Sequence, residues 1–187
     1  MGDNHIMTTS NRSNVQLAAE AGQSIWLDFI NRDLMKSGKL SQLVNLGVGG
    51  LTSNPTIFQN AIAQGSDYDS DLERLAGDGL DVNAIFDGLA LKDIADAADI
   101  FRPVYDRTGG ADGFVSIEVD PQLAGDTQST VEQARRLSAA LDRPNVLIKV
   151  PATPEGIPAI RTLIGEGISV NVTLIFSRDA YRNIANA

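Results

Sequence analysis

A lysine stands inside a run of residues that otherwise predicts a buried strand. In the segment 145–153, NVLIKVPAT, apolar residues flank Lys149 on both sides and Pro151 closes the run. Burying an ammonium group without a partner is costly, because the group loses strong hydration. A lysine in such a place tends to release its proton, and the neutral amine attacks carbonyl carbon. The segment therefore indicates a carbonyl-directed nucleophile. The alternative is a lysine on an edge strand that extends to water.

Other strand-like segments also place polar residues at alternate positions. Successive strand residues point to opposite faces, so each segment has one uniformly apolar face and one mixed face. The mixed face collects residues that could act together with Lys149: Asp28, Thr52, Asn54, Glu118, Asn171 and Thr173. Two carboxylates and one amine suffice for proton transfer when their surroundings hold them in different protonation states.

Five short apolar runs carry these residues. The predicted strands are Ser24–Ile30, Val48–Ser53, Gly113–Val119, Asn145–Val150 and Ser169–Phe176. Longer patterns with helical spacing lie between them. The alternation of strands and helices, without hairpin signals, predicts a parallel sheet.

The predicted helices cover three long segments and one short one. They are Asp33–Leu46, one or two helices in Val82–Asp106, and Thr127–Leu141 with a buried stripe of Val131, Ala134, Leu137 and Leu141. Thr153 can cap the fourth, with Pro154 at its first position and an end at Gly165 or Gly167. Its expected buried stripe is Ile157, Ile160 and Ile164. The acidic segment Gln64–Asp81 is interpreted as an insertion after the second strand.

The mixed face distinguishes between two kinds of parallel sheet. An open doubly wound sheet is covered by helices on both sides and needs apolar residues on both. A barrel turns one face into a lumen, whose mouth can hold polar groups. The fold class predicted is therefore α/β, a TIM (β/α)8 barrel. Only five β/α units are visible, so we expect residues 14–187 to be the N-terminal part of a barrel truncated after about five units, preceded by a disordered arm at 1–13.

Composition excludes several classes of protein. A net charge of −9 argues against nucleic acid and anionic membranes as partners. The absence of cysteine excludes disulfides and thiolate metal sites and fits a reducing cytoplasm. No apolar run reaches membrane-spanning length, and the polar N-terminus does not resemble a signal peptide. The single histidine, His5, lies in the predicted arm, so we expect no histidine base.

Five segments together resemble the transaldolase family, in its longer bacterial form, over nearly all of residues 14–187. They are SIWLDFINRDLMKSG around Asp28, GLTSNPTIF around Asn54, VSIEVDP around Glu118, VLIKVPATPEGIPAI around Lys149, and GISVNVTLIFS around Asn171 and Thr173. All five occur in order, at the ends of the predicted strands.

The resemblance implies catalytic roles for four residues. Lys149 would form a Schiff base with the ketone of a ketose phosphate. Asp28 would move the proton of the C4 hydroxyl, and Glu118 with Thr173 would position a proton-carrying water. The activity implied is transfer of a dihydroxyacetone unit between sugar phosphates in the pentose phosphate pathway, in the cytoplasm, with no metal or other cofactor.

The resemblance also implies a set of substrate-binding residues. Asn54 and Asn171 would hydrogen-bond the substrate hydroxyls, and Thr52 and Ser53 would line the same strand end. Transaldolases hold the phosphate with a serine and an arginine on and after a sixth strand, beyond the printed sequence. Arg178 and Arg182 are not expected to replace them.

Several alternatives remain open from the sequence. Asp28 could form a plain ion pair with Lys149, Asn54 could be only a turn former, and Asn171 or Thr173 could be core polar residues. The related fructose-6-phosphate aldolases share the fold and the lysine, but have glutamine at the position of Glu118 and lack the Asn-x-Thr pattern. A catalytically silent barrel fragment is a further alternative. Unpaired edge strands also predict homo-oligomerisation or other self-association.

Overall fold

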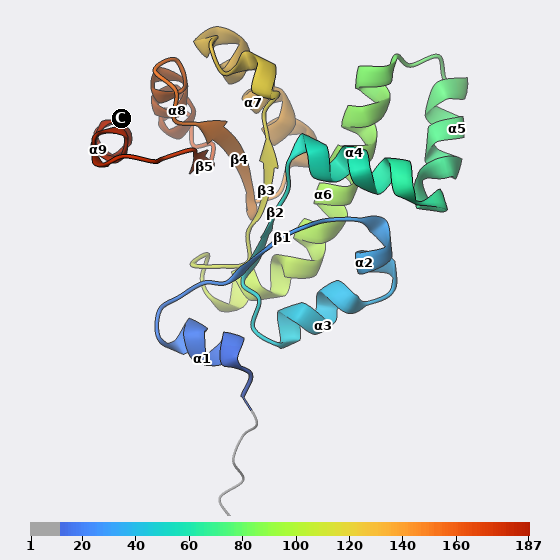
Figure 1. Ribbon diagram of the computed structural model, residues 1–187, viewed down its shortest axis with the longest axis horizontal. Helices are drawn as coiled ribbons and strands as arrows, with labels where there is room; N and C mark the ends of the chain where they lie inside the picture. Colours follow the sequence, from blue (N-terminus) through green and yellow to red (C-terminus); the bar gives the residue numbers. More distant parts are fainter. Residues whose placement is uncertain (1–11) are drawn as a thin grey trace, which may run out of the picture.

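The computed structural model describes residues 12–187, which form one five-stranded parallel sheet with helices packed against it (Figure 1). The strands are β1 (Trp26–Asp28), β2 (Gly50–Thr52), β3 (Val115–Glu118), β4 (Val146–Pro151) and β5 (Val170–Thr173). They lie in the order β1-β2-β3-β4-β5, and every neighbouring pair is parallel. A doubly wound sheet reverses its strand order at a switch point, whereas a barrel adds each strand beside the previous one. The predicted barrel-type α/β fold is therefore confirmed.

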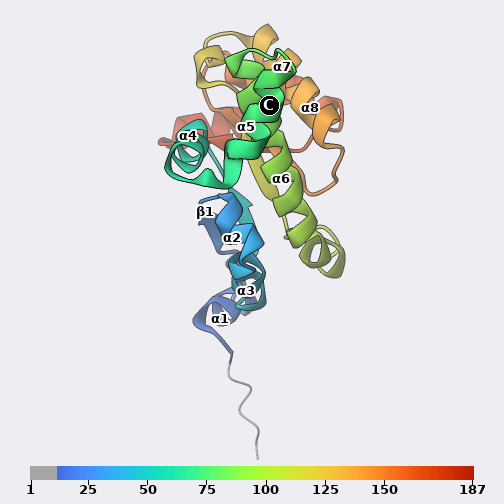
Figure 2. The same cartoon turned by 90° about the vertical axis from the view of Figure 1, so that its right-hand side faces the viewer.

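Nine helices are described within residues 12–187. They are α1 (Asn14–Glu20), α2 (Arg32–Lys36), α3 (Lys39–Asn45), α4 (Pro55–Gln64), α5 (Asp69–Gly77), α6 (Val82–Arg107), α7 (Thr127–Leu141), α8 (Gly156–Gly165) and α9 (Arg178–Ala185). Two 3-10 turns, η1 (Ser66–Tyr68) and η2 (Pro121–Leu123), precede α5 and α7. Figure 2 shows α1 to α3 at one end of the molecule and α7 and α8 at the other. Within this described range, no helix is both long and apolar enough to span a bilayer.

The expected arm at residues 1–13, with His5, lies largely outside the described residues. Only residues 12 and 13 of this arm are described. Ser13 caps α1, because its side chain accepts a hydrogen bond from the Gln16 amide. The helix α1 itself was not predicted from the sequence.

Two of the predicted helices have different bounds in the structure. The segment Asp33–Leu46 holds two helices instead of one, because the chain turns at Gly38 with φ of 76°, a left-handed value that glycine adopts without strain. The helix expected from Pro154 begins at Gly156, although the Thr153 hydroxyl still accepts a hydrogen bond from the Gly156 amide at 2.9 Å. The segment Gln64–Asp81, interpreted as an insertion after the second strand, contains η1 and α5.

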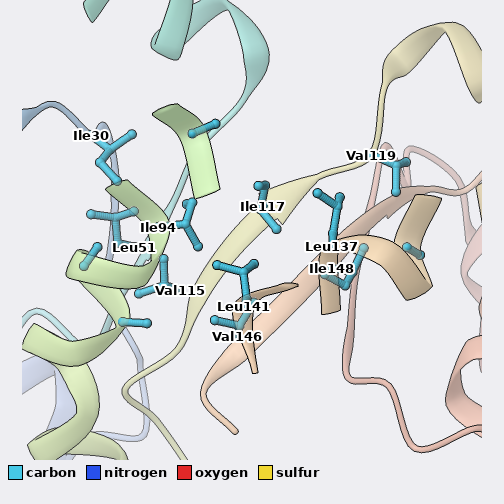
Figure 3. Packing of buried hydrophobic residues seen from close by; sticks show 14 of the residues in the cluster. Ile30, Leu51, Ile94, Val115, Ile117, Val119, Leu137, Leu141, Val146 and Ile148 are labelled. Atoms are coloured by element: carbon cyan, nitrogen blue, oxygen red, sulfur yellow. The ribbon is translucent and has the colours of Figure 1, made fainter. Parts of the chain in front are cut away.

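One face of the sheet forms the core beneath the helices. Its buried strand residues include Leu51, Val115, Ile117, Val146, Ile148 and Val150, and on β3 and β4 these are the residues that the alternation assigned to the apolar face. In the first and fifth predicted strands the apolar face extends too far, because Ile25, Phe29, Leu174 and Phe176 are 42%, 43%, 59% and 87% exposed. The predicted stripe of α7 is confirmed, and Figure 3 shows Leu137 and Leu141 beside Ile117 and Ile148. On α8, however, the buried face is centred on Ala159, Ile160 and Leu163, so the predicted core residue Ile164 lies at its border and is 58% exposed.

The other face carries the polar residues in two rows fixed by the strand register. Asp28 pairs with Thr52, and Thr52 pairs with Ser116. The second row lies two residues further along the strands, where Glu118 pairs with Lys149 and Lys149 pairs with Asn171. Because partners in register point to the same side of a sheet, these residues share a face, as predicted.

A buried ionic cluster links α2 to η1, α5 and α6. The Arg32 guanidinium contacts Asp93 at 2.9 Å and Asp71 at 2.8 Å, and it lies over the ring of Tyr68. The Tyr68 hydroxyl donates to the second oxygen of Asp93 at 2.7 Å. Burial, the largest effect, raises the pKa of Asp93, although the hydrogen bonds from Tyr68 and Arg32 act to lower it. The fully buried Asp93 carboxylate therefore depends on these two partners.

We expect Asp93→Asn to destabilise the fold by about 3 kcal/mol, because it leaves a buried guanidinium with one carboxylate fewer. Asp96→Asn on the same helix breaks an exposed pair with Lys92 and should cost at most about 1 kcal/mol. Urea unfolding of both variants measures the difference. Equal losses would contradict a structural role for the cluster.

Candidate active site

Lys149 lies on β4, an interior strand that pairs with β3 on one side and β5 on the other. Only 9% of the residue is exposed. Its Nζ donates a hydrogen bond to the backbone carbonyl of Ser53 at 2.9 Å and lies 3.6 Å from Oε2 of Glu118. The alternative of an edge-strand lysine that extends to water is therefore wrong.

Asn171 lies on β5 and is the register partner of Lys149 on β4. Its side-chain Nδ2 donates to the hydroxyl of Ser116 at 3.0 Å, and Ser116 is itself fully buried. This bond fixes the direction of the amide, since the nitrogen faces β3. The side-chain oxygen of Asn171 then remains to accept a hydrogen bond.

Asn54 has a structural function that the sequence left as an alternative. It is the N-cap of α4, and its Oδ1 accepts a hydrogen bond from the Ile57 amide at 2.9 Å, with Pro55 at the first helical position. The oxygen is thus engaged by the helix, whereas the Nδ2 group can still donate. Asn54 can therefore offer a ligand a donor while it caps the helix.

A cleft of about 470 Å³ opens at the carboxyl ends of β3, β4 and β5. Its lining includes Asn54, Glu118, Lys149 and Thr173, four of the predicted site residues, together with Pro55, Thr56, Ile57, Pro121 and Leu174. The hydroxyl of Thr173 is buried and has no hydrogen-bond partner among residues 12–187, and the same holds for Thr52. A buried hydroxyl without a partner costs free energy. Of the two residues, Thr173 lines the cleft.

The remaining predicted residues lie around this cleft without lining it. Asp28 is exposed at the end of β1, in register with the half-buried Thr52. Within the described part of the chain, the carboxylate paired with Lys149 is that of Glu118, so the alternative of an Asp28–Lys149 ion pair is wrong. Ser53 is fully buried, and its hydroxyl donates to the Ser116 carbonyl at 2.9 Å.

Sequence reasoning missed the group nearest to the amine. The carbonyl of Ser53 belongs to the backbone, and a backbone acceptor cannot be recognised from the type of the residue. The hydroxyl of Ser116, which orients Asn171, lay on the predicted mixed face but was not singled out. Among residues 12–187, no three acidic or histidine side chains gather as they would around a metal ion.

Comparison with known proteins agrees with this geometry. Residues 25–187 match the family described as transaldolase/fructose-6-phosphate aldolase. The chain belongs to this family. It is 50% identical over 184 residues to "Transaldolase 1" of Streptomyces avermitilis, covering 97% of the chain and 49% of that protein. It is also 52% identical over 170 residues to "Transaldolase 2" of Streptomyces coelicolor, covering 90% of the chain and 46% of that protein.

A third relative gives a similar match. The chain is 46% identical over 186 residues to the "Transaldolase" of Trichodesmium erythraeum, covering 99% of the chain and 47% of that protein. The chain thus spans about half the length of the curated transaldolases that it matches. The match to the transaldolase/fructose-6-phosphate aldolase family includes β1 to β5 and so all of the candidate site residues.

The residue after Thr173 has an unusual backbone. Leu174 has φ of 62°, in the left-handed region that side chains with a Cβ atom seldom adopt, and it is 59% exposed. Such a conformation costs about 1–2 kcal/mol in a non-glycine residue. Leu174 lines the cleft directly after Thr173, so the strain lies at the edge of the site.

We expect Leu174→Gly to be more stable than Leu174→Ala by about 1 kcal/mol, because only glycine relieves the left-handed strain. Both variants remove the same exposed side chain, so the alanine variant is a matched control. Thermal or urea unfolding gives the comparison. If alanine were the more stable, as it is in ordinary helices and strands, the strain at this position would be disproved.

Proposed function

We propose that this chain carries the Schiff-base chemistry of a transaldolase, which transfers a dihydroxyacetone unit between sugar phosphates. In the full reaction, sedoheptulose 7-phosphate and glyceraldehyde 3-phosphate give erythrose 4-phosphate and fructose 6-phosphate. The observation that carries the proposal is the buried Lys149 amine, 3.6 Å from the Glu118 carboxylate and on the wall of a cleft at the strand ends. The names of the similar proteins from Streptomyces and Trichodesmium support it.

In the first stage, the neutral amine of Lys149 attacks the ketone carbon of the ketose phosphate and forms a carbinolamine. Loss of water then gives a protonated imine, so protons must reach the departing hydroxyl and leave the nitrogen. Glu118 is the carboxylate nearest to Nζ, and the unpaired Thr173 hydroxyl lies on the same cleft. We assign to this pair the placement of the water that carries those protons.

In the second stage, the imine accepts the electron pair of the C3–C4 bond. Asp28 removes the proton of the C4 hydroxyl, the bond breaks, an aldose leaves, and a dihydroxyacetone enamine stays on Lys149. Addition of an acceptor aldose reverses these steps, with Asp28 returning the proton. The exposed Asp28 carboxylate on the same sheet face as Lys149, one row lower, supports this division of roles.

Substrate hydroxyls would be held by groups that the fold leaves available. Asn54 keeps its Nδ2 donors while its oxygen caps α4. Asn171 keeps its Oδ1 acceptor while its Nδ2 donates to Ser116. The two amides can therefore offer a substrate both donors and acceptors, and Thr52 is a further polar residue on this face.

Fructose-6-phosphate aldolase is the second candidate, because the matched family includes both activities. Two residues favour transaldolase. Glu118 occupies the position at which fructose-6-phosphate aldolases have glutamine. Asn171 and Thr173 form the Asn-x-Thr pattern that those aldolases lack. The curated relatives named above are all called transaldolase.

Cytoplasmic location and self-association are part of the same proposal. Within residues 12–187, β1 and β5 each pair on one side only, which leaves their outer backbone groups free to pair with another strand. The apolar residues Phe176 and Tyr181 next to β5 are 87% and 62% exposed and add to this surface. Sedimentation velocity at several concentrations tests whether the chain associates.

The proposed nucleophile is tested by borohydride reduction in the presence of fructose 6-phosphate. We expect a covalent adduct on Lys149 and none in Lys149→Ala, because only a substrate-derived imine is reduced to a stable amine. Lys92→Ala, which removes an exposed lysine, is the control and should keep the adduct. An adduct that persists in Lys149→Ala and maps to Lys92 would overturn the assignment, and no adduct at all would indicate a silent fragment.

The two carboxylates are expected to act at different stages. Glu118→Gln should slow formation and hydrolysis of the imine, whereas Asp28→Asn should let the imine form but block carbon–carbon cleavage. Loss of a general acid or base typically costs about 10²–10⁴ in rate. Rapid mixing with fructose 6-phosphate, followed by reductive trapping and by measurement of the released aldose, separates the stages. The division of roles is wrong if both variants stop at the same stage.

A further inference from the structure

Two polar groups from the segments ending β2 and β3 lie close to the Lys149 amine. The amine donates a hydrogen bond to the Ser53 carbonyl, which follows β2, at 2.9 Å, and the Glu118 carboxylate of β3 lies 3.6 Å from Nζ, at ion-pair distance. A neutral amine has two N–H bonds and one lone pair in a tetrahedral arrangement. When one N–H bond is directed at the Ser53 carbonyl, rotation about the Cε–Nζ bond is restrained, and the lone pair points away from that carbonyl. Lys149 itself lines the cleft.

The Ser53 carbonyl is held in place from both sides of its peptide bond. On one side, the Ser53 hydroxyl donates to the carbonyl of Ser116 on β3 at 2.9 Å, and the residue is fully buried. On the other side, Asn54 is extended, with φ of −147° and ψ of 165°, as the following Pro55 requires. Asn54 is fixed further because it caps α4. The segment therefore holds its carbonyl rigidly beside the amine.

We propose that Ser53 is a positioning residue, which acts through its backbone carbonyl to aim the lone pair of Lys149 at an incoming ketone. Its hydroxyl does not reach substrate, because it is buried and bound to β3. Its function is to anchor the peptide group that accepts the hydrogen bond from the amine. The inference rests on the proposed function, since it assumes that Lys149 is the nucleophile.

The test is reductive labelling of the full chain by dihydroxyacetone and cyanoborohydride, because this small ketone needs no phosphate-binding group. Mass spectrometry of peptides gives the labelling rate at Lys149 and at the other three lysines, Lys36, Lys39 and Lys92, which are exposed. In Ser53→Ala we expect the rate at Lys149 to fall about two- to tenfold, as loss of one hydrogen bond allows. The rates at the exposed lysines should not change.

Two further variants separate positioning from general loss of stability. Tyr68→Phe removes another buried hydroxyl, which donates to Asp93 at 2.7 Å, and should leave the rate at Lys149 unchanged. Ser53→Cys keeps a weaker donor of similar size and should give an intermediate rate. It also carries the test if Ser53→Ala does not fold.

Each result decides the question. A rate at Lys149 that is the same in wild type, Ser53→Ala and Ser53→Cys would overturn the positioning role while leaving Lys149 as the nucleophile. An equal fall in Tyr68→Phe would assign the effect to stability and would overturn it too. If wild-type Lys149 were labelled no faster than the exposed lysines, both this inference and the proposed nucleophile would fail.

Discussion

The Lys149 amine must find acceptors inside a sheet, and this requirement constrains the neighbouring strands. Its polar partners are a carbonyl after β2 and a carboxylate on β3, so three consecutive strands must be aligned at their carboxyl ends. The register between Glu118 and Lys149 achieves this. A shift of β4 by one residue would turn the lysine into the apolar layer beneath the helices, away from both partners. Packing of that layer and the chemistry of the opposite face are therefore coupled.

The protein contains a second buried cation, and its surroundings are different. Arg32 has two carboxylate partners and lies against an aromatic ring, whereas Lys149 has one carboxylate at a longer distance and a neutral carbonyl. A guanidinium stays charged in proteins, so full compensation makes it a structural link between α2 and α6. Lys149 instead lines the cleft, where a ligand can reach it. Both cations are costly to bury, but Arg32 links two helices, whereas Lys149 is a candidate nucleophile.

The strands and their faces could be predicted because alternation along a strand is a local property. Val115, Ile117 and Ile148 lie in the core for this reason, and Glu118 and Lys149 face the other way. The buried stripe of α7 could be predicted in the same way, because it follows from the spacing of apolar residues within one helix. The break at Gly38 and the exposure of Ile164 depend instead on how helices meet the sheet, which residue spacing does not specify. The same limit applied to the site, where side chains could be named from the sequence but the acceptor from Ser53, a backbone group, could not.

The strand order has a consequence for how the sheet is made. Each strand pairs only with the strands immediately before and after it in the chain, and a helix-containing segment separates every pair. Every strand is therefore synthesised after the neighbour with which it pairs, so the chain order allows the sheet to grow one strand at a time from β1. Lys149 is synthesised after both of its polar partners, the Ser53 carbonyl and Glu118.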